Sequence, residues 1–181
     1  MKRMVLVVLI VLALSAAAFA QSQAEIDKAL LPAPRQLKAD ATVIKWKPDF
    51  TYDTLKKGTN KLVCYDRSGQ AGQQPFAVEC TSLANLERVA QSLKIEASTD
   101  KKDLRAAFET FEKEGKWIKP EFGSLWIHMS GADQASARMH TTIAVPGATT
   151  QSIGFPDNPR QGGVWIMDAG SSEAHLMTPG S

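Results

Sequence analysis

The chain has 181 residues, 44% of them hydrophobic and 22% charged, a composition that excludes an intrinsically disordered protein. Lys2 and Arg3 are two of its 21 basic residues and residues 1–20 carry no acid, so the rest of the chain holds 19 basic and 19 acidic residues. A stretch with no net charge and no basic run lacks the electrostatic footprint of a nucleic-acid-binding protein.

The first twenty residues have the three parts of an export signal. Lys2 and Arg3 supply positive charge, residues 4–14 are apolar, and Ala18 and Ala20 are the small residues that a signal peptidase accepts. We therefore expect residues 1–20 to be a cleavable signal peptide, and the product to be periplasmic or secreted, with no stable membrane span. The alternative is an uncleaved membrane anchor, because the apolar run is close to the shortest length that spans a bilayer.

Two cysteines, Cys64 and Cys80, follow the predicted signal peptide. In an oxidising compartment two cysteines pair by default, and closing a loop of about 15 residues stabilises a fold by roughly 3 kcal/mol. Their spacing fits no C-x-x-C pattern, which argues against a catalytic or metal-binding pair. We therefore expect a structural disulfide.

Short β-like segments dominate the first half of the exported chain. Residues 21–41 are expected to be an N-terminal tether, with a short helix over Ala24–Leu31 that Pro32 ends. The segment Lys57-Gly58-Thr59-Asn60 indicates a hairpin between the second and third of four predicted strands. These strands are Thr42–Trp46, Tyr52–Lys56, Leu62–Asp66 and Phe76–Cys80.

Two helices are predicted in the middle of the chain. Thr81 or Ser82 is expected to cap the first, whose apolar residues recur at helical spacing over residues 83–93. The second is expected to begin near residues 98–100 and to end at Gly115, a suitable C-terminal cap. Its expected buried face consists of Leu104, Ala107, Phe108 and Phe111.

The chain becomes β-like again after Phe122 and contains two long polar loops, 130–138 and 146–163. Loops of that length in a compact domain are often functional. Strands are predicted at Leu125–Met129, Met139–Val145, Val164–Met167 and His175–Thr178. Residues 42–181 are therefore expected to form a single α+β domain, an antiparallel β-sheet with two central helices, stapled by one disulfide.

Four segments of the chain carry a resemblance. They are VCYDRSG and ECTSLANLERVAQ, then LWIHMSGADQASARMHTTIAVPGAT, and finally GGVWIMDAGSSEAHLM. Together they resemble a group of exported bacterial proteins of unknown function, over most of residues 40–179. The resemblance implies bacterial export, but it implies no reaction, cofactor or catalytic residue.

The three histidines all lie in the C-terminal part, and each has a methionine close by. Copper sites use mixed His and Met ligation, because thioether sulfur suits Cu(I) and imidazole accepts either copper state. Since alternate residues of a strand share a face, one face of the predicted sheet would carry Trp126, His128, His140, Thr142, Trp165, Met167, His175 and Met177. The candidate copper ligands on this face are His128, His140, His175 and Met177.

Other interpretations stay open beside copper binding. A small secreted hydrolase would pair Ser130, Asp133 or Ser136 with a histidine, but the chain has no G-x-S-x-G motif. Structural roles for the His, Met and Trp residues are the plainer interpretation. A non-enzymatic binding or interaction module for an envelope or extracellular ligand is thus the first expectation, with no catalytic residue assigned. Its expected surface is the loop 146–163, which contains Gln151, Asn158, Arg160 and Gln161.

Overall fold

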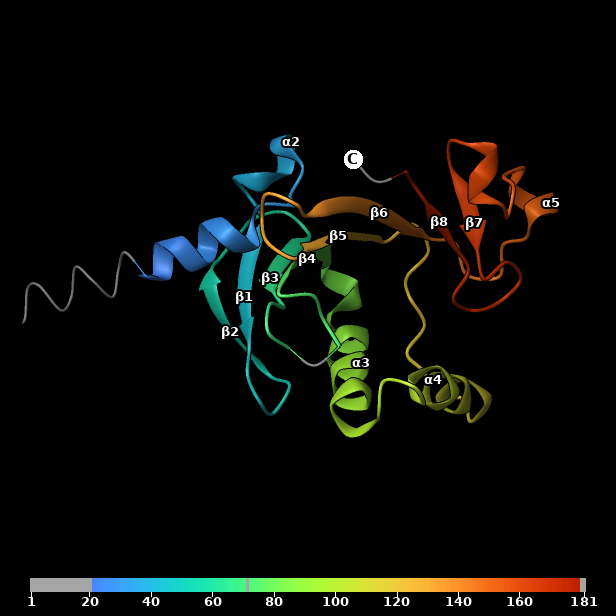
Figure 1. Ribbon diagram of the computed structural model, residues 1–181, viewed down its shortest axis with the longest axis horizontal. Coiled ribbons are helices and arrows are strands. Elements are labelled where there is room, and N and C mark those ends of the chain that lie inside the picture. Colours follow the sequence, from blue (N-terminus) through green and yellow to red (C-terminus); the bar gives the residue numbers. More distant parts are fainter. Residues whose placement is uncertain (1–20, 71, 180–181) are drawn as a thin grey trace, which may run out of the picture.

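A computed structural model describes residues 21–70 and 72–179 of the chain (Figure 1). This part contains eight strands: β1 (Thr42–Trp46), β2 (Tyr52–Lys56), β3 (Leu62–Asp66), β4 (Phe76–Ser82), β5 (Leu125–Gly131), β6 (Arg138–Ala144), β7 (Trp165–Met167) and β8 (His175–Met177). They form one sheet in the order β2-β1-β3-β4-β5-β6-β8-β7. Neighbouring strands are antiparallel except β1 and β3, which are parallel.

The predicted hairpin between β2 and β3 is wrong. β2 folds back on β1 instead, through a turn in which the Asp49 carboxylate accepts hydrogen bonds from the backbone N–H and the hydroxyl of Thr51. The connection to β3 then passes the start of β1, where a Cβ on Gly58 would lie 2.2 Å from the Asp40 carbonyl oxygen. A residue with a side chain would clash at this crossing. Glycine at position 58 therefore allows the connection to pass β1 and reach its other side. β3 pairs with β1 there in parallel, so the sheet is mixed and not antiparallel as predicted.

The disulfide lies on one face of the sheet, together with the N-terminal segment. Cys64 on β3 and Cys80 on β4 are directly opposite each other, are fully buried, and form the predicted bond. Residues 21–29 are helical, and Lys28 Nζ pairs with Asp66 Oδ2 at 2.6 Å. The segment expected to be a tether is part of the core, because its apolar residues recur at helical spacing and cover the disulfide. These residues are Ile26, Ala29, Leu30 and Ala33.

Helix α3 (Leu86–Ser98) packs on the opposite face, after the 3-10 turn η1 (Leu83–Asn85). The core on this face consists of Leu86, Val89 and Leu93 of α3 with Ile44, Val63 and Tyr65 of the strands. Ser82 occupies the N-cap position of η1, but neither predicted cap makes a side-chain capping hydrogen bond, and β4 continues through both residues. The Thr81 hydroxyl donates to the Leu125 carbonyl oxygen, and the Ser82 hydroxyl oxygen accepts from the Leu125 N–H. These hydroxyls join β4 to β5 instead of capping a helix.

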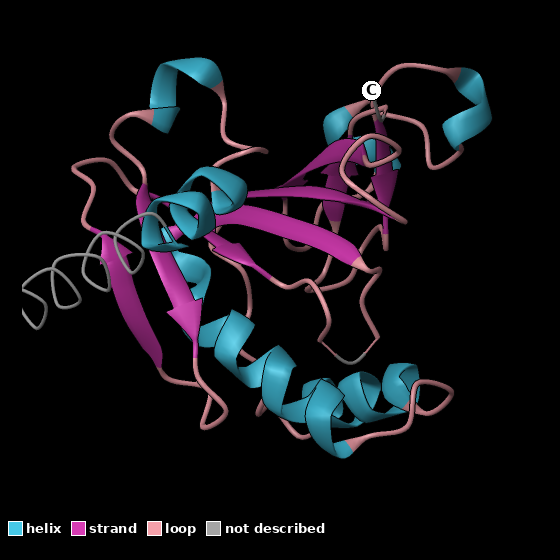
Figure 2. Cartoon of the chain, turned by 60° about the vertical axis from the view of Figure 1, so that its left-hand side comes forward, coloured by secondary structure: helices cyan, strands magenta, loops and turns pink. Residues whose placement is uncertain are grey.

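Helix α4 (Leu104–Lys113) lies beside α3, away from the strands, and none of its residues is buried (Figure 1). The residues of the expected buried face, Leu104, Ala107, Phe108 and Phe111, are half-buried and not buried, and Gly115 ends the helix with φ 68° as predicted. Residues 114–124 return the chain to β5. The two long helices lie together on one side of the sheet (Figure 2). The fold thus agrees with α+β only in broad outline, because the sheet is large and mixed and the helices are not central.

The C-terminal end of the sheet has its own small core, formed by Val145, Ile166 and Ala174. The loop predicted at 146–163 contains two short helical elements next to this core, α5 (Thr150–Ile153) and the 3-10 turn η2 (Pro159–Gln161). One further short helix, α2 (Arg35–Lys38), precedes β1. Within residues 21–70 and 72–179, no helix is long and apolar enough to cross a membrane.

Candidate functional site

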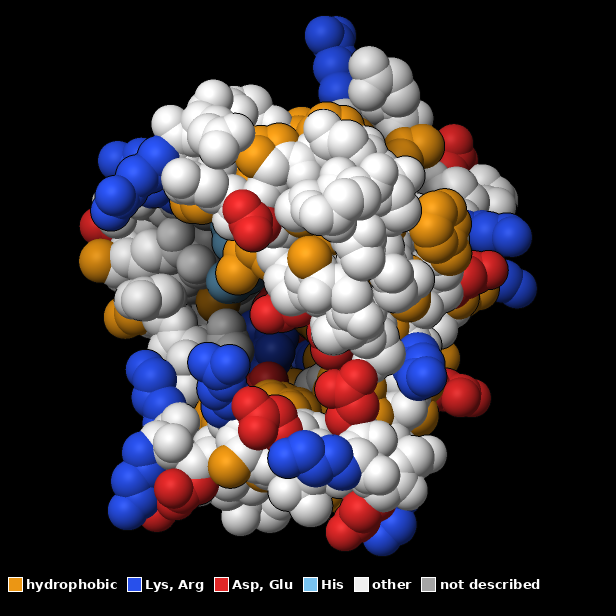
Figure 3. Space-filling view, turned by 90° about the vertical axis from the view of Figure 1, so that its right-hand side faces the viewer, with side chains coloured by type: hydrophobic (Ala, Val, Ile, Leu, Met, Phe, Trp, Pro, Cys, Tyr) orange, Lys and Arg blue, Asp and Glu red, His pale blue; other side chains and the backbone are white. Residues whose placement is uncertain are grey.

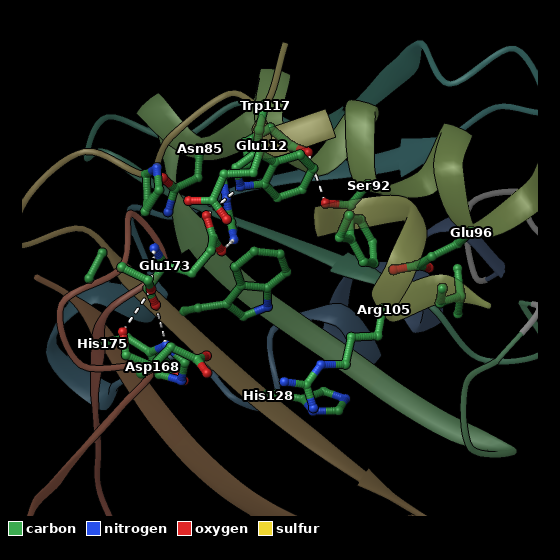
Figure 4. Close-up of a pocket in the computed structure, with 18 of the residues that line it drawn as sticks. Asn85, Ser92, Glu96, Arg105, Glu112, Trp117, His128, Asp168, Glu173 and His175 are labelled. Atoms are coloured by element: carbon green, nitrogen blue, oxygen red, sulfur yellow. Dashed lines mark hydrogen bonds and ion pairs between the residues drawn. The ribbon is translucent and has the colours of Figure 1, made fainter. Parts of the chain in front are cut away.

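A cleft of about 1050 Å³ opens between the sheet and the two long helices. Figure 3 shows this hollow with acidic and basic side chains around its opening. Figure 4 shows side chains from the helices, from the strands and from the β7–β8 loop pointing into the same space. The cleft is therefore assembled from segments that are far apart in the sequence.

The strands β4, β5 and β6 form the floor of the cleft with their alternate residues. Strand pairing places Glu79, His128 and His140 in one row across the three strands. The next row holds Thr81, Trp126 and Thr142. Since residues opposite each other in adjacent strands point to the same face, both rows point toward α3 and α4.

A buried cluster of charged side chains lies at the bottom of the cleft. The Arg67 guanidinium is 2.5 Å from Glu96 Oε2 and 3.7 Å from Glu79 Oε1, and only 4% of the Arg67 side chain is exposed. Trp126 Nε1 donates a hydrogen bond to Glu79 Oε2 at 3.1 Å. Burial raises the pKa of Glu79, and the positive charge of Arg67 opposes that rise. The deepest charged groups of the cleft are thus already paired with one another.

The two histidines of the floor are both perturbed. Burial, and to a lesser extent the nearby His140 and Arg67, together lower the pKa of His128 to about 4. Burial and His175 lower the pKa of His140. Both imidazoles are therefore neutral at pH 7, with one lone-pair nitrogen each. His128 Nε2 is buried 3.8 Å from Glu79 Oε1 and has no hydrogen-bond partner in the part of the chain that the structure describes.

Helix α4 forms the wall opposite the floor. Leu104 and Phe108 line the cleft on the same side of the helix, facing the space above Trp126. The Glu112 carboxylate of α4 accepts a hydrogen bond from the Ser172 hydroxyl in the β7–β8 loop. An apolar side of α4 therefore borders an open volume instead of a packed core.

Glu173 joins three segments at one end of the cleft. Its carboxylate pairs with Arg88 of α3 and accepts a hydrogen bond from Trp117 Nε1. The guanidinium carbon of Arg88 lies 5.1 Å from the Trp117 ring and 5.4 Å from the Trp126 ring, within the range of cation–π attraction. The β7–β8 loop thus holds the α4–β5 connection and α3 together.

The structure brings three of the four predicted copper ligands to the cleft. His128, His140 and His175 line it, whereas the Met177 sulfur accepts a hydrogen bond from the Thr142 hydroxyl at 3.4 Å and Met177 is not among the lining residues. Within the described residues, no three His, Cys, Asp or Glu side chains are already arranged to hold a metal ion. Copper binding by the predicted set therefore stays a prediction.

The serine, aspartate and loop residues singled out in the sequence lie elsewhere. Asp133 and Ser136 hydrogen-bond to each other in the exposed β5–β6 loop, with Oγ–Oδ1 at 2.8 Å. Ser130 does not line the cleft, and neither does any residue of the loop 146–163. The residues that sequence reasoning missed are Arg67, Glu79 and the apolar side of α4. One signal was available, because Glu79 is a lone charge inside the apolar segment Phe76–Cys80.

Comparison of the chain with known protein families, with curated proteins and with solved structures finds no match.

Proposed function

We propose that this chain is an exported, non-enzymatic binding protein whose cleft takes a small organic ligand. The observation that carries the proposal is the position of α4. Its apolar side chains Leu104 and Phe108 face a cleft of about 1050 Å³, and no residue of the helix is buried. Apolar surface that no core covers marks a binding site in soluble proteins, and concave, largely preformed pockets are the usual ligand sites.

The lining indicates the chemistry of the ligand. Trp126 on the floor and Phe108 on α4 line the cleft with aromatic rings, while the charged side chains around them offer hydrogen bonds that fix orientation. Six carboxylates and four basic side chains line the cleft, so a neutral or cationic ligand is favoured over an anionic one. We infer a flat, largely apolar molecule that carries hydrogen-bonding groups and no negative charge.

Export is part of this proposal. It rests on the signal-like residues 1–20, and the buried Cys64–Cys80 disulfide is compatible with an oxidising compartment. The ligand would then be an envelope or extracellular compound.

A protein-observed NMR screen of the purified, isotope-labelled protein tests the proposal. The probes are two sets of small aromatic compounds, one neutral or cationic and one anionic, and the variants are Phe108→Ala and Phe111→Ala. Both variants remove one ring from α4, but only Phe108 lines the cleft, since Phe111 faces a groove beside Ala90 and Ile118. We expect hits in the first set that shift the indole N–H of Trp126, with affinity lowered at least tenfold by Phe108→Ala and unchanged by Phe111→Ala.

Two results would contradict the proposal. One is that no compound shifts the resonances of cleft residues. The other is that both variants weaken binding equally, because that would place the ligand outside the cleft or show a general effect on α4.

A further inference from the structure

We propose that His128 and His140 form a two-coordinate Cu(I) site on the floor of the cleft. This inference concerns a metal ion and does not depend on the organic ligand proposed above. Binding is a simple ligation of Cu(I) by neutral imidazoles, with no change in oxidation state.

The first argument is distance. His128 on β5 and His140 on β6 are directly opposite each other, and their ring centroids lie 5.4 Å apart at an interplanar angle of 85°. Since metal–imidazole nitrogen bonds are about 2.0 Å long, one ion between two imidazoles holds the ring centroids up to ~6 Å apart. The pair thus lies within the reach of a single ion, and side-chain rotation is enough to aim a nitrogen of each ring at it.

The second argument is the freedom of the ring nitrogens. Among the hydrogen bonds of the described residues, none involves a ring nitrogen of His128 or His140, and His128 Nε2 is a buried nitrogen without a partner. Buried polar atoms are rarely left unpaired unless they serve a ligand, an ion or a water molecule. These nitrogens are therefore available to an ion without breaking an existing contact.

The third argument is the choice of ion. Zn²⁺ takes four tetrahedral ligands and Ca²⁺ takes six or more oxygens, but no set of three His, Cys, Asp or Glu side chains stands ready in the described residues. Cu(I) accepts fewer ligands, and imidazole is among the donors that suit copper.

The test is an anaerobic titration of the purified protein with Cu(I) against bicinchoninic acid as competing chelator. We expect one Cu(I) per chain, affinity at least tenfold weaker in His140→Gln, and unchanged affinity in Met177→Leu. Met177→Leu is the matched control, because its sulfur is engaged by Thr142 on the same face of the sheet. X-ray absorption of the Cu(I) complex should show nitrogen neighbours and no sulfur.

Far-UV circular dichroism establishes that each variant is folded before it is titrated. The proposal is overturned if the wild-type protein does not compete for Cu(I), if folded His140→Gln binds as tightly as the wild type, or if sulfur is found in the first coordination shell. Phe108→Ala, which tests the organic ligand, is expected to leave Cu(I) affinity unchanged, so the two proposals can fail separately.

Discussion

Single residues in the cleft owe their properties to strands that meet only in the folded protein. Glu79 belongs to an otherwise apolar strand, and in the structure it faces Arg67, Trp126 and His128. The sequence shows that a charge interrupts the strand, but it does not show which residues neutralise that charge. His128 and His140 could be placed on one face by alternation alone, whereas their direct opposition depends on the β5–β6 register, which the loop between them determines.

The pH dependence of stability is a residue-scale prediction. In the unfolded chain His128 takes up a proton as the pH falls through about 6.5, whereas in the folded protein burial lowers its pKa to about 4. The unfolded state binds more protons between these values, so the stability contributed by His128 is lost as the pH falls from 6.5 toward 4. His140 acts in the same direction, and Glu79 in the opposite one, because burial raises the pKa of its carboxyl.

Urea unfolding of the metal-free protein at about pH 7 and pH 5 measures this effect, with His128→Gln as the comparison. We expect the wild type to lose more free energy of unfolding between the two pH values than the variant does. Equal losses in both proteins would show that His128 ionises normally in the folded state.

At the scale of elements, local patterns predicted where strands and helices lie better than how they pack. Alternation located all eight strands, and helical spacing located α3 and α4. The pairing of β2 with β1 was missed because the Asp49–Thr51 turn and the close approach at Gly58 act across the chain. The apolar side of α4 looks the same in sequence whether it borders a core or a cleft.

Helix α4 is expected to be the less stable of the two long helices. Five residues of α3 are buried, whereas none of α4 is. Since local opening costs least where few apolar contacts are made, the amide hydrogens of α4 should exchange with solvent faster than those of α3. Hydrogen-exchange mass spectrometry measures both helices in one sample. Equal protection of α3 and α4 would mean that α4 is held as firmly as the core.

For the whole molecule, the sheet separates two different environments. The disulfide and residues 21–29 lie on one face, and α3 and the cleft lie on the other. Residues 21–41 were expected to be a tether because two prolines interrupt the segment, but its apolar residues pack on Cys64 and Cys80. The disulfide itself could be predicted, because two cysteines in a chain that is expected to be exported leave one pairing.

The disulfide is expected to stabilise the whole domain. Cys64 and Cys80 are 16 residues apart, and a loop of that size contributes about 3 kcal/mol by restricting the unfolded chain. The double variant Cys64→Ala/Cys80→Ala should therefore unfold at lower urea concentration, with a free energy of unfolding reduced by about 3 kcal/mol. A midpoint equal to that of the wild type would show that packing around the two side chains, and not the bond, maintains this face.

The order of the strands also has a consequence for how a chain folds when its N-terminus enters the oxidising compartment first. β1 to β4, the disulfide and α3 all lie before residue 99, whereas the partner of β4 on its other side, β5, is about 50 residues further along. A chain that emerges from its N-terminus can therefore close its first half, bond included, while β4 still presents an open edge. An unpaired strand edge can pair with another chain. The segment from α4 to β5 must therefore fold onto β4 before such pairing occurs. The cleft is the last feature to form, when that late strand docks.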